Sequence, residues 1–134
     1  MDLFWSRCEG PIAFGVNDCC MTVADVLVAG GKADLMAGYR GRYRSRRGFA
    51  LAFRRAGHRD LAAAVAASFS AHGRRVQCAA RLDVALIGHF DAVTQSEIVS
   101  PAFHDGGFWF ARSDAGALVV KDAGAFDIWR IDDA

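Results

Sequence analysis

The sequence lacks several features that assign a protein to a broad class at once. It has no run of 18 or more apolar residues, which argues against a transmembrane helix. Only two of its 134 residues are proline and 53% are hydrophobic, so a disordered or linker-like chain is excluded. The first residues show neither the basic nor the apolar region of a secretory signal. We therefore expect a single domain over residues 1–134, made in a reducing cytoplasm.

The sequence also lacks the cysteine spacing of a metal site. Its four cysteines are Cys8, Cys19, Cys20 and Cys78. They match no zinc pattern, and two adjacent cysteines cannot easily hold one ion. We expect mostly buried free thiols, with no metal and no cofactor.

The chain as a whole has almost no net charge; its formal net charge is +1. Residues 1–81, however, carry thirteen Lys or Arg and six Asp or Glu, a balance of +7. Residues 82–134 carry three and nine, a balance of −6. Such a two-sided charge distribution is more consistent with an assembly component than with a freely diffusing enzyme.

Hydrophobic periodicity predicts helices in the first half of the chain. Apolar residues recur at spacings of three and four over residues 18–29, with Asn17 or Asp18 as N-cap and Gly30-Gly31 as the end. Further helices are predicted over residues 45–55 and 60–71, and a helix or turn over residues 34–39.

The second half of the chain has the pattern of strands separated by Asp- and Gly-rich turns. The predicted strands cover residues 82–88, 97–99, 107–111, 117–120 and 126–131. Predicted turns are Asp105-Gly106-Gly107, Asp114-Ala115-Gly116 and Asp122-Ala123-Gly124. The order predicts an α+β fold, in which a helical half (about residues 1–75) packs on an antiparallel sheet half (about residues 76–134).

Cys19 is the sharpest candidate for chemistry, because it falls in the first turn of a predicted helix. The helix dipole and unpaired N–H groups there favour a thiolate, so the cysteine can be more reactive than a free thiol. The alternative is a small buried side chain on the helix face.

The run from Phe14 to Cys20, which opens this helix, resembles the nucleophile helix of the NlpC-type cell-wall peptidases, which are papain-like cysteine hydrolases. The segment from Asp105 to Ala111 resembles the turn and strand that carry the third catalytic residue of those enzymes. The chain is still more similar to a family of phage and prophage tail-cluster proteins related to them. That resemblance rests on Asp18-Cys19-Cys20, the Arg-Gly-Arg-Tyr-Arg run from Arg40 to Arg44, and Trp129-Arg130.

The resemblance implies a papain-like, NlpC-type fold and a place in the virion tail, reached after synthesis in the bacterial host cytoplasm. The partners it implies are tail-tip or hub proteins, and possible contact with peptidoglycan. Cys19 takes the place of the nucleophile. The base position falls on Gln95 or Ser96 and the orienting position near Phe110, so two of three catalytic roles look vacant.

Four histidines are available as substitutes for the missing base. His89 and His104 lie in the sheet half, and either could approach Cys19, whereas His58 and His72 lie at helix ends, where a cation favours the dipole. The leading hypothesis is a tail-tip assembly component with a degenerate catalytic site. The alternative is an active cysteine peptidase or amidase on peptidoglycan, with His104 or His89 as its base.

Eight arginines lie within twenty residues, at positions 40, 42, 44, 46, 47, 54, 55 and 59. They could bind phosphate, with Tyr43 and Phe49 stacking on bases. They could instead dock an acidic protein, or simply pair with aspartates of the same fold. The candidate binding residues are Arg40, Arg42, Tyr43 and Arg44. Nucleic acid is the least favoured partner, because the chain has no clear net positive charge.

Overall fold

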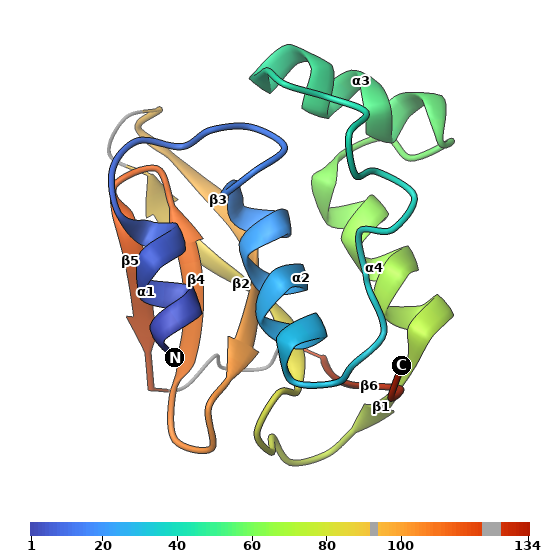
Figure 1. Cartoon of the computed structure of the whole chain (residues 1–134), viewed down its shortest axis with the longest axis vertical. Helices are drawn as coiled ribbons and strands as arrows, with labels where there is room; N and C mark the ends of the chain where they lie inside the picture. Colours follow the sequence, from blue (N-terminus) through green and yellow to red (C-terminus); the bar gives the residue numbers. More distant parts are fainter. Residues whose placement is uncertain (92–93, 122–126) are drawn as a thin grey trace.

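The chain runs through four helices before it enters the main sheet (Figure 1). This computed structural model describes residues 1–91, 94–121 and 127–134. The helices are α1 (Asp2–Cys8), α2 (Cys19–Ala29), α3 (Arg46–Arg55) and α4 (Leu61–His72). The strands are β1 (Gly73–Val76), β2 (Val84–Asp91), β3 (Ser96–His104), β4 (Trp109–Ser113), β5 (Gly116–Val120) and β6 (Ile128–Ile131). The α+β class is confirmed. Within the described ranges, no helix is long and apolar enough to span a membrane.

Side-chain caps explain why three of the helices begin where the sequence indicates. Asp18 accepts hydrogen bonds from the first-turn N–H groups of α2, Ser45 does so for α3, and Asp60 for α4. Each oxygen satisfies a donor that the first turn of a helix leaves without a partner. The predictions for these three helices are therefore confirmed to within one residue at each end.

Two further elements were not predicted from the sequence. The short helix α1 carries one fully buried residue, Phe4, whose ring meets Phe103 and Phe110 edge-on at 5.3 and 5.5 Å between centroids. Strand β1 contains Arg74 and Arg75 and lacks the apolar alternation of a strand. It forms because β6 pairs with it, a contact that local sequence does not encode.

The segment from Asp34 to Tyr39 is a series of turns and not a helix. The Asp34 side chain accepts a hydrogen bond from the backbone N–H of Met36, which closes a local turn. Of the two structures expected for this segment, the turn is correct.

All strand pairs are antiparallel, in the order β1-β6-β2-β3-β4-β5. Strand β2 begins at Val84, two residues after the start predicted for it. Leu82 has a positive φ of 69°, and Asp83 lies outside the ladder. The turn at Asp105 is formed as expected, since its carboxylate accepts from the N–H groups of Gly107 and Phe108. The predicted Asp122-Ala123-Gly124 turn lies outside the described residues.

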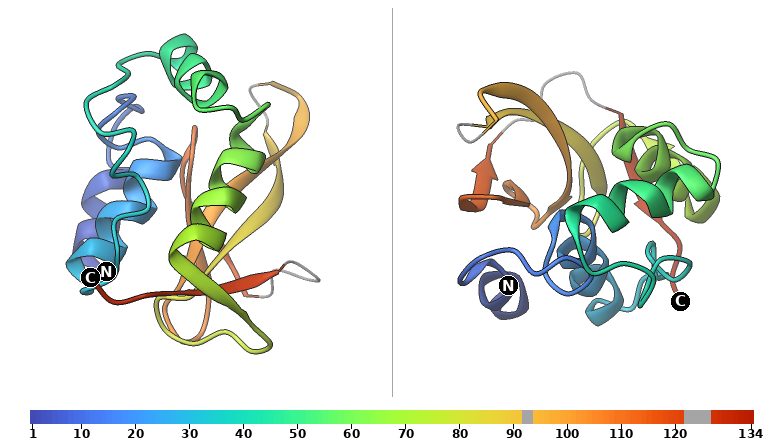
Figure 2. Two further views of the ribbon diagram at one scale, coloured as in Figure 1. Left: turned by 90° about the vertical axis from the view of Figure 1, so that its right-hand side faces the viewer. Right: turned by 90° about the horizontal axis from the view of Figure 1, so that it is seen from above.

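The sheet separates two hydrophobic clusters. Val84 and Phe103 face the helices, together with Met21 and Leu27 of α2. Their neighbours along the strands belong to the other cluster, formed by Ala85, Ile87, Ala102, Trp109 and Ala111. Alternate residues of a strand point to opposite faces, so each sheet residue can be assigned to one side. The sheet is curved, and α1 and α2 lie together on one side of it (Figure 2).

A buried ion pair fastens β6 to the start of β2. Asp83 is 1% exposed, and its two carboxylate oxygens accept from Nε and Nη2 of Arg130 at 2.9 and 2.8 Å. The backbone of Ala80 also donates to Asp83, at 2.8 Å. The ladder between β2 and β6 has two residue pairs, and this bidentate contact adds a further attachment between the two strands.

We expect Asp83→Ala to lower the free energy of unfolding by about 2 kcal/mol. The variant loses two charge-assisted hydrogen bonds, and water can replace them only in part because the Arg130 side chain is partly buried. Urea unfolding measures the loss. Asp127→Ala is the matched control, because Asp127 pairs with Arg75 on the surface and its removal should cost less than about 0.5 kcal/mol. Equal losses in the two variants would contradict a special role for Asp83.

Candidate functional site at the start of α2

Cys19 is the first residue of α2 and lies half-buried at the wall of a cleft of about 500 Å³. The cleft is bounded by the segment before α2, the starts of α3 and α4, and strands β2 to β4. Its lining includes Phe14, Phe49, Val99 and Arg112. The prediction that places Cys19 in the first helical turn is confirmed, and the thiol faces a space large enough for a small ligand.

The residue before Cys19 is the most highly bonded carboxylate of the site. Asp18 is 1% exposed, and its Oδ1 accepts from the N–H groups of Cys20 and Met21 at 3.1 and 3.0 Å. Its Oδ2 accepts from the N–H of Gly15 and from the hydroxyl of Tyr43, both at 2.8 Å. Four donors therefore hold a buried negative charge and fix the start of α2.

Gly15 is required for this arrangement. Its φ is +86°, and a Cβ atom at this position would lie 2.5 Å from the backbone oxygen of Tyr43. A larger residue would push the Arg40–Tyr43 segment away from the helix start.

The second cysteine of the pair differs from the first. Cys20 is buried, and its Sγ lies 3.9 Å from that of Cys19. The contact with Cys19, burial and the negative charge of Asp18 together raise the pKa of Cys20, so it stays a neutral thiol. Of the two adjacent thiols, Cys19 is the one that meets the cleft.

Asp18, Cys19 and Cys20 place three potential metal-ligand atoms within 4.8 Å of one another. The group is a poor fit for an ion, however, because the oxygens of Asp18 already accept four hydrogen bonds and Cys20 is held protonated. The geometry favours a structural carboxylate beside one accessible thiol.

The histidines proposed as bases do not meet Cys19. Nε2 of His89 lies 2.9 Å from Oγ of Ser100, and the ring of His104 packs on Trp109 at 4.8 Å. Both histidines alternate with helix-facing residues, so they belong to the face of the sheet that carries the second cluster. Among the described residues, no histidine lines the cleft. His58 and His72 line a separate hollow beside α4.

The residues at the positions expected for the base and for its orienting partner do not lie at the cleft. Gln95 and Ser96 do not line the cleft, and Phe110 is buried under α1. On strand β4 it is Arg112, two residues further on, that lines the cleft.

Sequence reasoning missed Arg112, a cation in an otherwise apolar strand. It is 1% exposed and donates to the backbone oxygens of Gly10 and Ser113 at 2.8 and 3.2 Å. Its Nε finds no acceptor within the described part of the chain. The guanidinium ties the segment before α2 to the end of β4, and so shapes one wall of the cleft.

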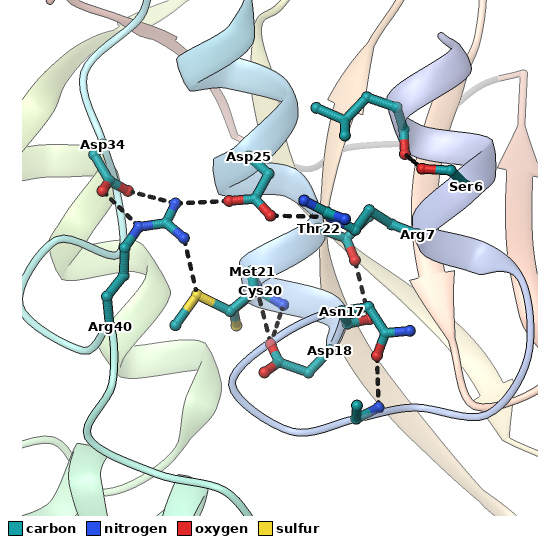
Figure 3. Close-up of polar contacts among 12 residues, drawn as sticks. Ser6, Arg7, Asn17, Asp18, Cys20, Met21, Thr22, Asp25, Asp34 and Arg40 are labelled. Atoms are coloured by element: carbon teal, nitrogen blue, oxygen red, sulfur yellow. Dashed lines mark hydrogen bonds and ion pairs between the residues drawn. The ribbon is translucent and has the colours of Figure 1, made fainter.

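The residues of the predicted binding segment from Arg40 to Arg44 differ in their surroundings: some contact other parts of the fold, and others are exposed. Arg40 lies along α2, where its guanidinium pairs with Asp25 at 2.9 Å and Asp34 at 2.7 Å and donates to Sδ of Met21 at 3.6 Å (Figure 3). Burial alone would raise the pKa of Asp34, but the hydrogen bonds from Arg40 and Met36 outweigh it and lower that pKa. The guanidinium of Arg40 is thus engaged in contacts within the fold.

Tyr43 is buried, and so is Phe49, whose ring lies 4.9 Å from it. The expectation that these rings stack on bases does not agree with their burial, because their faces are already covered. Arg42 and Arg44 remain exposed.

One comparison with known proteins matches nearly the whole chain. The model of a family described as a domain of unknown function, DUF6950, matches residues 5–131. The chain belongs to the DUF6950 family. Cys19, the Arg40–Arg44 segment and Trp129-Arg130 all lie within the matched range. No curated protein and no solved structure matches the chain.

We expect Tyr43→Phe to lower the free energy of unfolding by about 1.5 kcal/mol at neutral pH, because the buried carboxylate of Asp18 loses one of its four donors. Tyr39 is the only other tyrosine and supplies the control. Its ring packs on Phe53 without a hydrogen bond to its hydroxyl in the described structure, so Tyr39→Phe should cost less than about 0.5 kcal/mol.

The same variant should change the response to alkali. Burial and the charge of Asp18 raise the pKa of Tyr43 in the folded state above its value of about 10 in the unfolded chain. Its contribution to stability is therefore complete below pH ~10 and is lost as the pH rises further. Unfolding curves at several alkaline pH values should show a shallower fall for Tyr43→Phe than for the unmodified chain. A parallel fall would contradict the buried Asp18–Tyr43 contact.

Proposed function

We propose that this DUF6950 chain is an assembly component of a phage or prophage tail tip, built on a papain-like, NlpC-type domain whose hydrolytic chemistry is degenerate. One observation carries the proposal: Cys19, which the resemblance assigns to the place of the nucleophile, lines a cleft that no histidine among the described residues lines. Cysteine hydrolysis needs a base within hydrogen-bond reach of the thiol.

Two backbone donors next to Cys19 are already engaged within the fold. In a working site, backbone N–H groups at the helix start would stabilise the tetrahedral intermediate. Here the N–H groups of Cys20 and Met21 donate to Asp18 instead. This use of the helix start supports a structural rather than a catalytic role for the first turn.

The three motifs that carry the resemblance to tail-cluster proteins all make structural contacts. Asp18 of the first motif accepts from Tyr43 of the second, and Arg40 of the second binds along α2. Arg130 of the third holds Asp83. These contacts stabilise the fold, and a stable fold is sufficient for an assembly component that performs no catalysis.

The alternative function is an active peptidase or amidase on the stem peptides of peptidoglycan. It is favoured by the half-exposed Cys19 thiol in a cleft of suitable size. It requires His89 or His104 to move from the other face of the sheet.

Zymography on purified cell wall distinguishes the two functions. We expect no clearing by the unmodified chain, and the same result for Cys19→Ala. Clearing that disappears in Cys19→Ala but persists in Cys78→Ala, which changes an exposed thiol away from the cleft, would overturn the degenerate site. Alkylation with iodoacetamide confirms that the Cys19 thiol is accessible in the preparation used.

The assembly role is tested in tail particles purified from a lysogen that encodes the chain. We expect the chain to be present in the particles, deletion of its coding region to reduce intact tails at least about tenfold, and Cys19→Ala to restore them. Intact tails without the chain would overturn the assembly role.

A further inference from the structure

The structure divides the eight arginines between residues 40 and 59 into two groups. Arg40 pairs with Asp25 and Asp34, Arg46 with Asp114, and Arg59 with Asp60. The other five have neither an ion pair nor a side-chain hydrogen bond within the described residues; they are Arg42, Arg44, Arg47, Arg54 and Arg55. Pairing within the described part of the fold therefore accounts for three of the eight, and the other five are exposed.

Two of these unpaired arginines meet at one hollow. Arg42, from the segment before α3, and Arg55, the last residue of α3, line a space of about 540 Å³. Tyr39 completes one wall, and Gly38, Ala52 and Ala56 the rest, so no acidic residue takes part. Burial raises the pKa of Tyr39, and its hydroxyl remains a neutral group at physiological pH.

Helix electrostatics explain only part of this arrangement. Arg54 and Arg55 lie in the last turn of α3, where a cation interacts favourably with the carbonyl end of the helix. Arg42 lies outside any helix, so the dipole does not account for its position beside Arg55. Two guanidiniums on one hollow repel each other unless an anion lies between them.

The unpaired arginines do not form a nucleic-acid site. The aromatic side chains that could have stacked on bases, Tyr43 and Phe49, are buried. The net charge of the whole chain is only +1, which is unusual for a nucleic-acid-binding domain. Carboxylates suit the planar guanidinium as well as phosphates do, since both accept two parallel hydrogen bonds.

We propose that the hollow between Arg42 and Arg55 is the docking site for an acidic peptide segment of a neighbouring protein. The proposal deepens the assembly function above by naming the chemistry of the partner. Carboxylates of the segment bind the two guanidiniums and relieve their repulsion. Charge pairing of this kind fixes orientation and selects the partner.

Fluorescence anisotropy with a labelled peptide of alternating aspartate and glycine tests the proposal on the full chain. We expect binding at low ionic strength that weakens as salt is added. Arg42→Gln with Arg55→Gln should weaken it about tenfold or more, because charge-assisted hydrogen bonds are lost. Arg42→Lys with Arg55→Lys keeps the charge but not the fork geometry, and should give a smaller loss.

The matched control is Arg74→Gln with Arg81→Gln, which removes the same charge from exposed positions. Strand β1, which carries Arg74, lies at the opposite end of the molecule from α3 in Figure 1. We expect this control to change the affinity less than about twofold. Circular dichroism and urea unfolding show that each variant is folded. Since Arg42 and Arg55 contact no acidic residue of the described fold, we expect their variants to stay folded, with at most a small decrease in the urea midpoint from the helix-end charge of Arg55.

Three results would overturn the docking site: no peptide binding at low salt, equal losses in the paired variant and the control, or tighter binding to a labelled DNA duplex than to the peptide. Purified tails distinguish this failure from that of the assembly function. If the chain is present in tails but does not bind the peptide, only the docking site is wrong. If it binds the peptide through Arg42 and Arg55 but is absent from tails, only the assembly function is wrong.

Discussion

The buried carboxylate of Asp18 is the contact on which the rest of the structure depends. A charge that is removed from water destabilises a fold unless hydrogen bonds replace its hydration. Four donors do so here, from the first turn of α2, from Gly15 and from Tyr43. One side chain thereby begins the central helix, closes the loop before it and attaches the Arg40–Tyr43 segment. The orientation of Cys19 follows from these bonds, since it is the next residue.

The same contact limits what Cys19 can do. Two of the four donors that satisfy Asp18, the N–H groups of Cys20 and Met21, are at the helix start, where backbone donors could otherwise stabilise a developing oxyanion. The alternation of strand residues separately places His89 and His104 on the face of the sheet away from α2. Two independent constraints, a helix cap and a strand register, thus direct these N–H groups and these two histidines away from the Cys19 thiol.

The charge asymmetry of the chain acquires a structural meaning in the arginine segment. In the part of the chain that the structure describes, three ion pairs join the basic and acidic parts of the sequence: Arg46 with Asp114, Lys32 with Asp133 and Arg75 with Asp127. Arg40 instead pairs with Asp25 and Asp34, which lie in the basic part itself. Arg42, Arg44, Arg47, Arg54 and Arg55 have no ion pair among the described residues, and they lie on α3 or just before it, at the end of the molecule shown at the top of Figure 1.

Local sequence was sufficient for features that depend on nearby residues. The helices over residues 19–29, 46–55 and 61–72, their Asp and Ser caps and the Asp105 turn follow from side chains that bond within a few positions along the chain. Cys19 at a helix start belongs to this group. So does the α+β order, because a change of hydrophobic period is visible without contacts.

Tertiary structure alone decided the features that require residues distant in sequence to meet. Strand β1 exists because β6 pairs with it, and the short helix α1 is held by Phe103 and Phe110. The position of Tyr43 between arginines indicates a surface aromatic, but in the structure its hydroxyl donates to Asp18, 25 residues away in the sequence. The strand register, fixed by packing on both faces of the sheet, turned His89 and His104 away from Cys19. Composition specified how many charges the chain carries, but only folding determined which of them were left without a partner.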